Sequence, residues 1–313
     1  MKCHVLVAVV VVAFALICWQ LFPPNVLLPL PPLCDKVING QRVIICGASE
    51  GIGRDIALQY SQCGAHIAIA SRRAAVLAEV KRECEERGAA SVLAVAVDLA
   101  TTEGAQELIS SSVAHFASVA GAPNHRGIDV LILNHIKPFF DHWDDIEDPI
   151  STTQKIVEVN VLSYVYLTQY ALPYLRALDE DGLKGSIGVI SSQAGKMGLP
   201  QVAPYSLSKH ALHGFFDSLR LDITNSSNPN VDITICVLGS IDTKNARENT
   251  EGKLAKKNIK QYPSEECASA IIRGVANHAR EIYYPHFELQ IVNLLRPFLP
   301  GTIDQMILYL LSE

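Results

Sequence analysis

Short runs of β-branched and apolar residues alternate with longer amphipathic stretches between residues 40 and 285. This alternation is typical of parallel strands joined by crossover helices, because each kind of element has its own hydrophobic period. Near-continuous apolar runs such as "VLILN" and "DITICVL" indicate strands that are buried on both faces of a sheet. The sequence therefore predicts an α/β fold with a doubly wound parallel sheet, whose strands lie at Arg42–Cys46, His66–Ala70, Ser91–Val97, Val130–Leu133, Ser186–Ser191, Asp232–Leu238 and Glu281–Pro285.

Helical patterns fill the intervals between these strands. The run "RDIALQYSQC" ends at Gly64 and the charged run "AEVKRECEER" ends at Gly88, and glycine is the residue that most often follows a helix. Two longer patterns cover Thr153–Arg176 and Pro204–Asn225. Since ligands of open α/β sheets bind outside the carboxyl ends of the strands, we expect the functional site among the loops there.

The N-terminal segment Cys3–Phe22 carries no formal charge over a length sufficient to cross a bilayer. No small-x-small cleavage site follows it, so we expect an uncleaved membrane anchor, with a cleaved signal peptide as the alternative. The next stretch, "PPNVLLPLPP", contains too many prolines for a helix and predicts an extended spacer. The chain then divides into an anchor or signal at 1–22, a spacer at 23–35, an α/β domain at 36–286 and an apolar helical extension at 287–313.

The C-terminal extension is apolar at helical intervals and is broken by Pro297 and Pro300. Its pattern fits a cover for the core or for a second subunit, and it also fits contact with a membrane surface. The sequence leaves these roles open.

Charge and cysteine usage exclude other classes. The net charge of −6 argues against a nucleic-acid partner, which would favour a basic surface. The eight cysteines include no C-x-x-C pair and no Cys/His spacing suited to zinc, so no metal site is expected. We interpret the cysteines as mostly buried thiols, and their spacing leaves any disulfide pairing open.

Three glycines follow the first expected strand in the stretch "CGASEGIG". Gly47 would permit a tight turn out of the strand, Gly51 would let a pyrophosphate approach the backbone, and Gly53 would let the next helix pack closely. Free N–H groups and the helix dipole favour a phosphate at such a helix start. A plain strand-to-helix turn could use the same residues, but the flanking strand and helix favour a Rossmann-type dinucleotide site.

A second motif, "YSLSK", places Tyr205 and Lys209 one turn apart on a single helix face. Ser192 ends an expected strand thirteen residues earlier, and Asn160 lies in "VEVNVLSY" on the preceding long helix. A surface Tyr/Lys pair is the simpler alternative, but all four residues occur in a context that suits proton transfer to a carbonyl. Tyr205 would be the acid or base, Lys209 would lower its pKa, and Ser192 would hydrogen-bond the substrate oxygen.

The spacing G-x-x-x-G-x-G and the ordered set of Asn160, Ser192, Tyr205 and Lys209 resemble the short-chain dehydrogenase/reductase family over residues 40–285. The resemblance implies a catalytic domain at 36–286 that binds a nicotinamide dinucleotide. It also implies that Asn160 holds a water that links Lys209 to solvent. The coenzyme contacts so implied are Gly47, Ser49, Gly51, Ile52, Gly53, Asp98, Leu99, Asn134, Tyr205, Lys209, Ile241 and Thr243.

This sequence departs from the family pattern at several positions. His135 and Ile136 replace the last two residues of the N-A-G motif, and Leu238 replaces the usual proline before Gly239. We expect His135 to be a packing residue, because the other four residues already supply the proton chemistry.

The end of the second expected strand carries Arg72 and Arg73, where an acidic residue would bind the ribose 2′-hydroxyl of NAD. Guanidinium groups there suit the 2′-phosphate of NADP, to which they can donate paired hydrogen bonds. Glu50 in the glycine loop would repel that phosphate. We therefore expect NADP(H), with NAD as the less favoured coenzyme.

Within the family, "ILNHI", "VNVLSYVYLT", "VISSQAGK" and "CVLGSIDT" resemble the branch that acts on hydroxysteroids. This resemblance implies a homodimeric enzyme of the endoplasmic-reticulum membrane with a lumenal catalytic domain, acting on a steroid or another lipophilic alcohol or ketone. The alternatives are a retinoid or small-carbonyl substrate, a non-catalytic dinucleotide-binding membrane protein, and secretion after signal cleavage. The sequon "NSS" makes Asn225 a candidate glycosylation site if the domain is lumenal.

Overall fold

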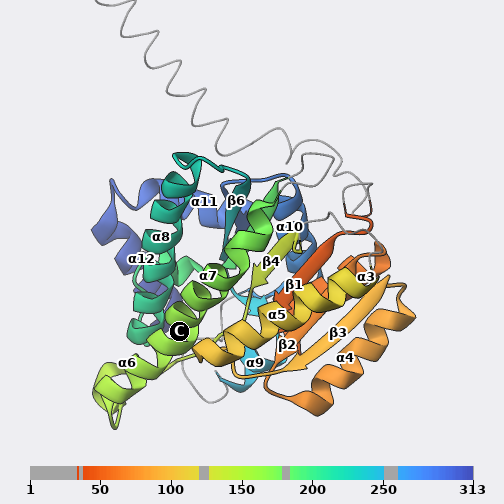
Figure 1. Ribbon diagram of the computed structural model, residues 1–313. Coiled ribbons are helices and arrows are strands. Elements are labelled where there is room, and N and C mark those ends of the chain that lie inside the picture. The colour runs from red at the N-terminus through yellow and green to blue at the C-terminus, as the bar shows by residue number, and fades with distance from the viewer. Residues whose placement is uncertain (1–33, 35–37, 120–126, 178–183, 250–259, 313) are drawn as a thin grey trace, which may run out of the picture.

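The computed structural model describes residue 34 and residues 38–119, 127–177, 184–249 and 260–312 (Figure 1). The expected anchor at 1–22 and the expected spacer at 23–35, apart from Cys34, lie outside these ranges. Within the described ranges, no helix combines the length and the apolar character needed to span a membrane.

Seven parallel strands form one sheet in the order β3-β2-β1-β4-β5-β6-β9 (Figure 1). The predicted Rossmann-type α/β fold is confirmed, and each predicted strand agrees with the observed one to within one residue at either end. The strand order reverses between β1 and β4, so the loops after these two strands diverge and leave a crevice for a ligand. The strands are β1 (Arg42–Cys46), β2 (His66–Ser71), β3 (Ser91–Ala96), β4 (Val130–Leu133), β5 (Gly185–Ile190), β6 (Val231–Leu238) and β9 (Glu281–Tyr284).

Helices cover both faces of the sheet. On one face, apolar residues of α3 (Gly51–Gln62), α4 (Ala74–Glu86) and α10 (Ser264–Ala276) join one buried cluster. On the other face, residues of α5 (Thr102–Val119), α7 (Ser163–Arg176) and α8 (Ala203–Thr224) join a second cluster, and Figure 1 shows these helices crossing in front of the sheet. Burial on both faces explains why the strands read as continuous apolar runs.

The long helix expected at Thr153–Arg176 is interrupted. The structure has α6 (Pro149–Val157), a π-helical turn at Glu158–Leu162 and then α7. Asp148 caps α6 by accepting a hydrogen bond from the Ser151 N–H at 3.0 Å. The wide turn contains Asn160, and such turns inside helices frequently mark functional sites.

Smaller elements surround the carboxyl edge of the sheet. Two short strands, β7 (Ile241–Asp242) and β8 (Tyr262–Pro263), pair in parallel, and α9 (Lys244–Glu248) follows β7. Two 3-10 turns lie at Trp143–Asp145 and Gln193–Gly195. The C-terminal segment forms α11 (His286–Leu295) and α12 (Pro300–Ser312), which are separated by the residues around Pro297.

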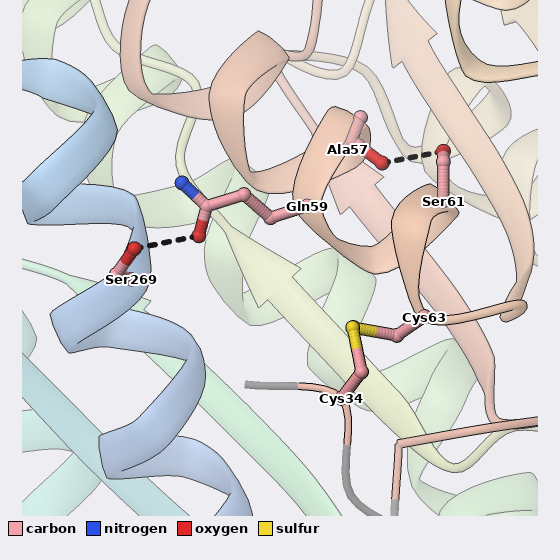
Figure 2. Close-up of a disulfide and its surroundings, with 6 residues drawn as sticks. All are labelled: Cys34, Ala57, Gln59, Ser61, Cys63 and Ser269. Atoms are coloured by element: carbon pink, nitrogen blue, oxygen red, sulfur yellow. Dashed lines mark hydrogen bonds between the residues drawn. A yellow bond between two sulfur atoms is a disulfide. The ribbon is translucent and has the colours of Figure 1, made fainter. Parts of the chain in front are cut away.

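Six cysteines lie among the described residues. Cys46, Cys84, Cys236 and Cys267 are buried free thiols, as expected. Cys34 forms a disulfide with Cys63 at the end of α3, a pairing that the sequence left open (Figure 2). The bridge attaches the chain that precedes the domain to the amino-terminal edge of the sheet, opposite the edge where ligands bind.

Candidate active site

The glycine loop forms a close-packed cradle between β1 and α3. Gly47 has a φ of +76°, and a Cβ atom there would lie 2.6 Å from the Cα of His135. A Cβ at Gly53 would lie 2.2 Å from the Gly47 carbonyl oxygen. That oxygen accepts a hydrogen bond of 3.0 Å from the Asn134 side chain, which fixes the loop against the end of β4. Side chains at these glycines would displace the backbone, so the loop leaves room for a phosphate beside the start of α3.

A cavity of about 560 Å³ opens above this loop. Its walls come from the carboxyl ends of β1 to β4, from α8 and from the start of α9. Gly53, Lys209 and Ile241 do not line it, and neither do Asn160 and Ser192. The predicted coenzyme residues that do line it are Gly47, Ser49, Gly51, Ile52, Arg72, Arg73, Asp98, Leu99, Asn134, Tyr205 and Thr243.

Helix α8 carries both Tyr205 and Lys209, and the turn after β5 carries Ser192. The Ser192 hydroxyl lies close enough to the Tyr205 hydroxyl to act on its pKa. Lys209 is fully buried behind them, with its Nζ 5.7 Å from the centre of the Tyr205 ring. The ammonium group donates a hydrogen bond of 2.8 Å to the Ile190 carbonyl oxygen, which fixes its position.

Burial is the main cause of the pKa shifts of Tyr205 and Lys209. It raises the pKa of Tyr205 to about 12, although the hydrogen bond with Ser192 acts in the opposite direction. It also lowers the pKa of Lys209 to about 7. The helical spacing predicts that Lys209 lowers the pKa of Tyr205, whereas in the structure removal from water disfavours the charged form of both side chains.

Asn160 is fully buried and connects α8 to the segment after β4. Its Oδ1 accepts a hydrogen bond of 2.7 Å from the Lys137 N–H. Its Nδ2 donates to the Lys137 carbonyl oxygen at 3.1 Å and to the Ser208 hydroxyl at 3.2 Å. These contacts place Asn160 close to the helix that carries Tyr205, while the water link to Lys209 stays a prediction.

His135 is fixed in place by contacts with two residues of α7. Its Nε2 lies 2.7 Å from the Ser163 hydroxyl, and the Tyr164 hydroxyl donates to its carbonyl oxygen at 3.0 Å. Burial, with the nearby charges of Lys209 and Arg72, lowers the His135 pKa to about 3. A neutral imidazole with this pKa is a poor base at neutral pH, which supports the expected packing role.

The two arginines after β2 have different surroundings. Arg73 forms an ion pair of 2.9 Å with Glu50 and donates a hydrogen bond of 2.9 Å to the Ser49 hydroxyl. Arg72 is exposed at the cavity and forms no hydrogen bond or ion pair within the described part of the chain. Both arginines and Glu50 are recognisable in the sequence, but only the tertiary structure pairs Glu50 with Arg73 and leaves Arg72 exposed at the cavity.

The remaining predicted contacts lie around the same cavity. Asp98 is exposed, and its Oδ1 accepts a hydrogen bond of 3.1 Å from the Ala100 N–H. Thr243 caps α9 by accepting a hydrogen bond of 3.1 Å from the Ala246 N–H. Ile241 is buried in the hydrophobic core. Two apolar side chains that no sequence motif had indicated, Phe139 and Phe140, also form part of the cavity wall.

The fold and this arrangement of side chains are those of a Rossmann-type oxidoreductase. The model of the short chain dehydrogenase family matches residues 41–254, and the chain belongs to that family. The family expected from the sequence is therefore confirmed.

Two curated relatives show where the chain lies within the family. It is 39% identical over 254 residues to the hydroxysteroid 11-beta-dehydrogenase 1-like protein of Xenopus tropicalis, with 80% of this chain and 81% of the relative covered. It is 40% identical over 266 residues to the protein of the same name from Gallus gallus, with 84% and 85% covered.

Solved structures share the fold at lower identity. A short-chain dehydrogenase/reductase from Burkholderia phymatum in complex with NAD has a TM-score of 0.70 and 17% identity, covering 86% of this chain and 96% of that chain. The Pseudomonas aeruginosa RhlG/NADP active-site complex has a TM-score of 0.68 and 21% identity, covering 80% and 97%. The two complexes hold different coenzymes, so the shared fold does not determine which one this protein uses.

Proposed function

We propose that this protein is an NADP(H)-dependent oxidoreductase that interconverts a hydroxyl and a ketone on a lipophilic substrate, a steroid. The observation that carries the proposal is the meeting of Ser192, Tyr205 and buried Lys209 beside a cavity whose glycine cradle fits a dinucleotide phosphate. The nicotinamide ring of the bound coenzyme would supply or accept the hydride.

The residues of this chain would handle the oxygen and its proton. In reduction, the carbonyl carbon gains a hydride and the Tyr205 hydroxyl gives its proton to the oxygen, so that an alcohol and a phenolate result. The Ser192 hydroxyl would donate a hydrogen bond to the same oxygen, where negative charge develops. Lys209, whose pKa is about 7, would stabilise the phenolate when protonated until a proton returns from solvent. Oxidation of the alcohol runs through the same groups in reverse.

The choice of NADP(H) rests on Arg72. Its guanidinium is exposed and has no ion-pair partner among the described residues. It follows β2, the strand whose end contacts the adenosine ribose in folds of this type. A charge-assisted hydrogen bond from this group to a 2′-phosphate would favour NADP(H) over NAD(H).

The substrate class rests on the cavity wall and on the relatives. Part of the wall of the cavity that Tyr205 also lines is apolar, which suits a lipophilic substrate; this part includes Pro138, Phe139, Phe140 and Val202. The curated relatives carry a hydroxysteroid dehydrogenase-like name. A retinoid or a small carbonyl compound is the alternative substrate, and a non-catalytic dinucleotide-binding protein is the alternative function.

The decisive experiment replaces Tyr205 by Phe. Loss of one acid–base group should reduce kcat between about 100- and 10,000-fold, while the dissociation constant of the dinucleotide changes little. Turnover would be measured on purified full-length protein with steroid, retinoid and small-carbonyl panels and with both coenzymes. Tyr174→Phe, on the exposed side of α7, is the matched control. A Tyr205→Phe protein with activity within threefold of wild type would contradict the proposal.

We also propose that the protein is attached to the endoplasmic-reticulum membrane with its catalytic domain in the lumen. The Cys34–Cys63 disulfide supports an oxidising compartment. Asn225 is exposed at the end of α8, where an attached oligosaccharide would be tolerated. In cells, we expect endoglycosidase to increase the mobility of wild type but not of Asn225→Gln, and the domain to resist protease until membranes are permeabilised. Digestion of the domain in sealed microsomes would instead place it in the cytosol.

A homodimer is the assembly that we propose. Exposed Trp143, Ile150 and Leu162 border an apolar hollow of about 600 Å³ formed by α6 and the turns before and after it, and this surface supports burial against a second copy. Light scattering of purified protein should give twice the chain mass, and Ile150→Glu should shift the distribution toward the monomer.

A further inference from the structure

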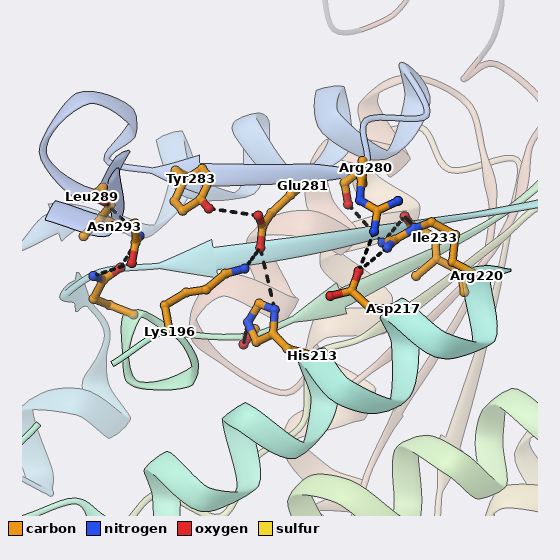
Figure 3. A network of polar contacts seen from close by, with 12 residues as sticks. Lys196, His213, Asp217, Arg220, Ile233, Arg280, Glu281, Tyr283, Leu289 and Asn293 are labelled. Carbon is orange, nitrogen blue, oxygen red and sulfur yellow. Dashed lines mark hydrogen bonds and ion pairs between the residues drawn. The ribbon is translucent and has the colours of Figure 1, made fainter. Parts of the chain in front are cut away.

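Ser192 belongs to a turn, residues 191–196, that we call the serine turn. It follows β5 and is contacted by side chains from α8, β9 and α11 (Figure 3). Two of these elements, β9 and α11, come about ninety residues later in the sequence than Ser192 itself. The contacts therefore connect the C-terminal part of the chain to the catalytic serine.

The first connection is a reciprocal amide pair between the serine turn and α11. Gln193 donates to the Asn293 Oδ1 at 3.2 Å, and Asn293 donates to the Gln193 Oε1 at 3.0 Å. Asn293 also donates to the Leu289 carbonyl oxygen within its own helix at 2.9 Å. Because Gln193 is the residue after Ser192, this pair restrains the backbone immediately beside the catalytic hydroxyl.

The second connection is an ion pair between the serine turn and β9. The Lys196 ammonium lies 2.5 Å from the Glu281 carboxylate, and both side chains are three-quarters buried. The Tyr283 hydroxyl donates to the other oxygen of Glu281 at 2.8 Å, which fixes the orientation of the carboxylate. Reduced exposure to water strengthens such a pair relative to a surface pair.

The third connection is made by His213 of α8, which contacts both the serine turn and β9. His213 Nε2 lies 3.0 Å from the Ser191 hydroxyl, while His213 Nδ1 lies 3.6 Å from the Glu281 carboxylate. Burial and the neighbouring Lys196 charge lower the pKa of His213 to about 3, so this imidazole is neutral at physiological pH. His213 follows Lys209 by one helical turn, on the helix that also carries Tyr205.

The serine turn also packs directly on the backbone of α8. A Cβ atom at Gly195 would lie 2.8 Å from the Ser191 hydroxyl oxygen and 2.9 Å from the Lys209 carbonyl oxygen. With so little space, a displacement of the turn would change the distance between the Ser192 and Tyr205 hydroxyls.

We propose that Glu281 and Asn293 are positioning residues, which hold the serine turn so that the Ser192 hydroxyl meets that of Tyr205. The inference rests on the proposed function for its catalytic consequence, although the positioning itself is a property of the fold. Misplacement of a catalytic group by about 1 Å can cost on the order of a hundredfold in rate, so the loss of one restraint should be measurable.

The test compares Glu281→Gln and Asn293→Ala with neighbours on the same elements. Arg280 lies just before β9, and Arg280→Gln removes its 3.1 Å ion pair with Asp217. Glu288 lies on α11, and Glu288→Gln alters its contact with Tyr262. We expect each positioning variant of the full-length protein to lose about tenfold in kcat, with KM and dinucleotide affinity within about twofold. The two control variants should retain wild-type kcat.

Conservative and compensating changes distinguish positioning from general damage. Asn293→Asp keeps an acceptor for Gln193 and should lose less activity than Asn293→Ala. The double variant Lys196→Glu/Glu281→Lys restores an ion pair of reversed polarity and should recover part of the activity that either single change removes. Absence of recovery in the double variant, with full activity in both Glu281→Gln and Asn293→Ala, would overturn the proposal.

A readout independent of turnover is the NMR resonance of the Tyr205 Cζ in protein labelled with ¹³C at that atom of tyrosine. Tyr205→Phe identifies the resonance, and Ser192→Ala shows how it moves when the neighbouring hydroxyl is removed. Glu281→Gln and Asn293→Ala should move it in the same direction, whereas the controls should not. An unmoved resonance would contradict positioning even if kcat falls. A wild-type protein without turnover would contradict the proposed function, and the resonance comparison would still decide the positioning.

Discussion

The Arg73 guanidinium and the Glu50 carboxylate lie 2.9 Å apart and join the end of β2 to the glycine loop. Arg72, the preceding residue, is exposed at the same cavity without such a partner in the described ranges. The two arginines are equivalent in the sequence and unequal in the structure. Two predictions on coenzyme choice follow from this difference.

Glu50→Gln should increase the affinity for NADPH. The change removes a negative charge from the place where a 2′-phosphate would bind and releases Arg73. The side chains are 48% and 30% exposed, so the expected gain is modest, about 1 kcal/mol or roughly fivefold in the dissociation constant. NADH affinity should stay within about twofold, as fluorescence titration would show. Glu79→Gln, on the exposed side of α4, controls for the loss of a carboxylate elsewhere.

Arg72→Ala should weaken NADPH binding far more than NADH binding, because only NADPH offers a phosphate to this side chain. A hydrogen bond to a charged group contributes about 1.5 to 3 kcal/mol, or roughly ten- to a hundredfold in affinity. Arg73→Ala should have the smaller effect, since Glu50 already neutralises Arg73. Equal losses for both coenzymes in Arg72→Ala would show that this arginine has a structural role instead.

Lys209 should make the free energy of unfolding depend on pH. Its pKa is about 7 in the folded protein and about 10.4 in an unfolded chain, so between these values the unfolded state binds more protons. The Lys209 contribution to stability therefore rises with pH across this window, by up to about 1.4 kcal/mol per unit. Below pH 7 the buried ammonium imposes its full cost.

Urea unfolding of wild type and Lys209→Met at pH 7, 8 and 9 would measure this contribution as a difference. The comparison is needed because burial raises the pKa of thiols such as Cys84, which lowers stability as the pH rises above about 8.5 in both proteins. A difference that stays constant with pH would mean that Lys209 keeps an ordinary pKa in the folded state.

Loss of the Cys34–Cys63 disulfide should destabilise the domain. The bridge closes a loop with a sequence separation of 29, for which the chain-entropy model gives about 3 to 4 kcal/mol. Cys34→Ser removes the bridge at its exposed end and leaves Cys63 in place. Dithiothreitol should lower the urea midpoint of wild type to that of the variant and leave the variant unaffected. Identical midpoints for oxidised wild type and variant would exclude a stabilising role.

Local sequence determined the elements of this fold and the identity of the main candidate residues. The apolar runs identified the seven strands of the sheet. The trace is most direct for central strands such as β1, β4 and β5, in which every residue is buried. Tyr205 and Lys209 were identifiable because four residues make one helical turn. Gly47 and Gly53 were identifiable because a strand-to-helix turn around a phosphate tolerates no side chain there.

Tertiary structure decided how these residues are paired and how they titrate. Glu50 reaches Arg73, Gln193 reaches Asn293 and Cys34 reaches Cys63 only because parallel strands and crossover helices bring distant segments together. The sequence predicts a lowered pKa for Tyr205 and the structure raises it, and this difference also arises from tertiary packing. A charge next to a tyrosine can be read from helical spacing, but the loss of solvent that raises its pKa to about 12 depends on every element packed around it, and no local pattern encodes that sum.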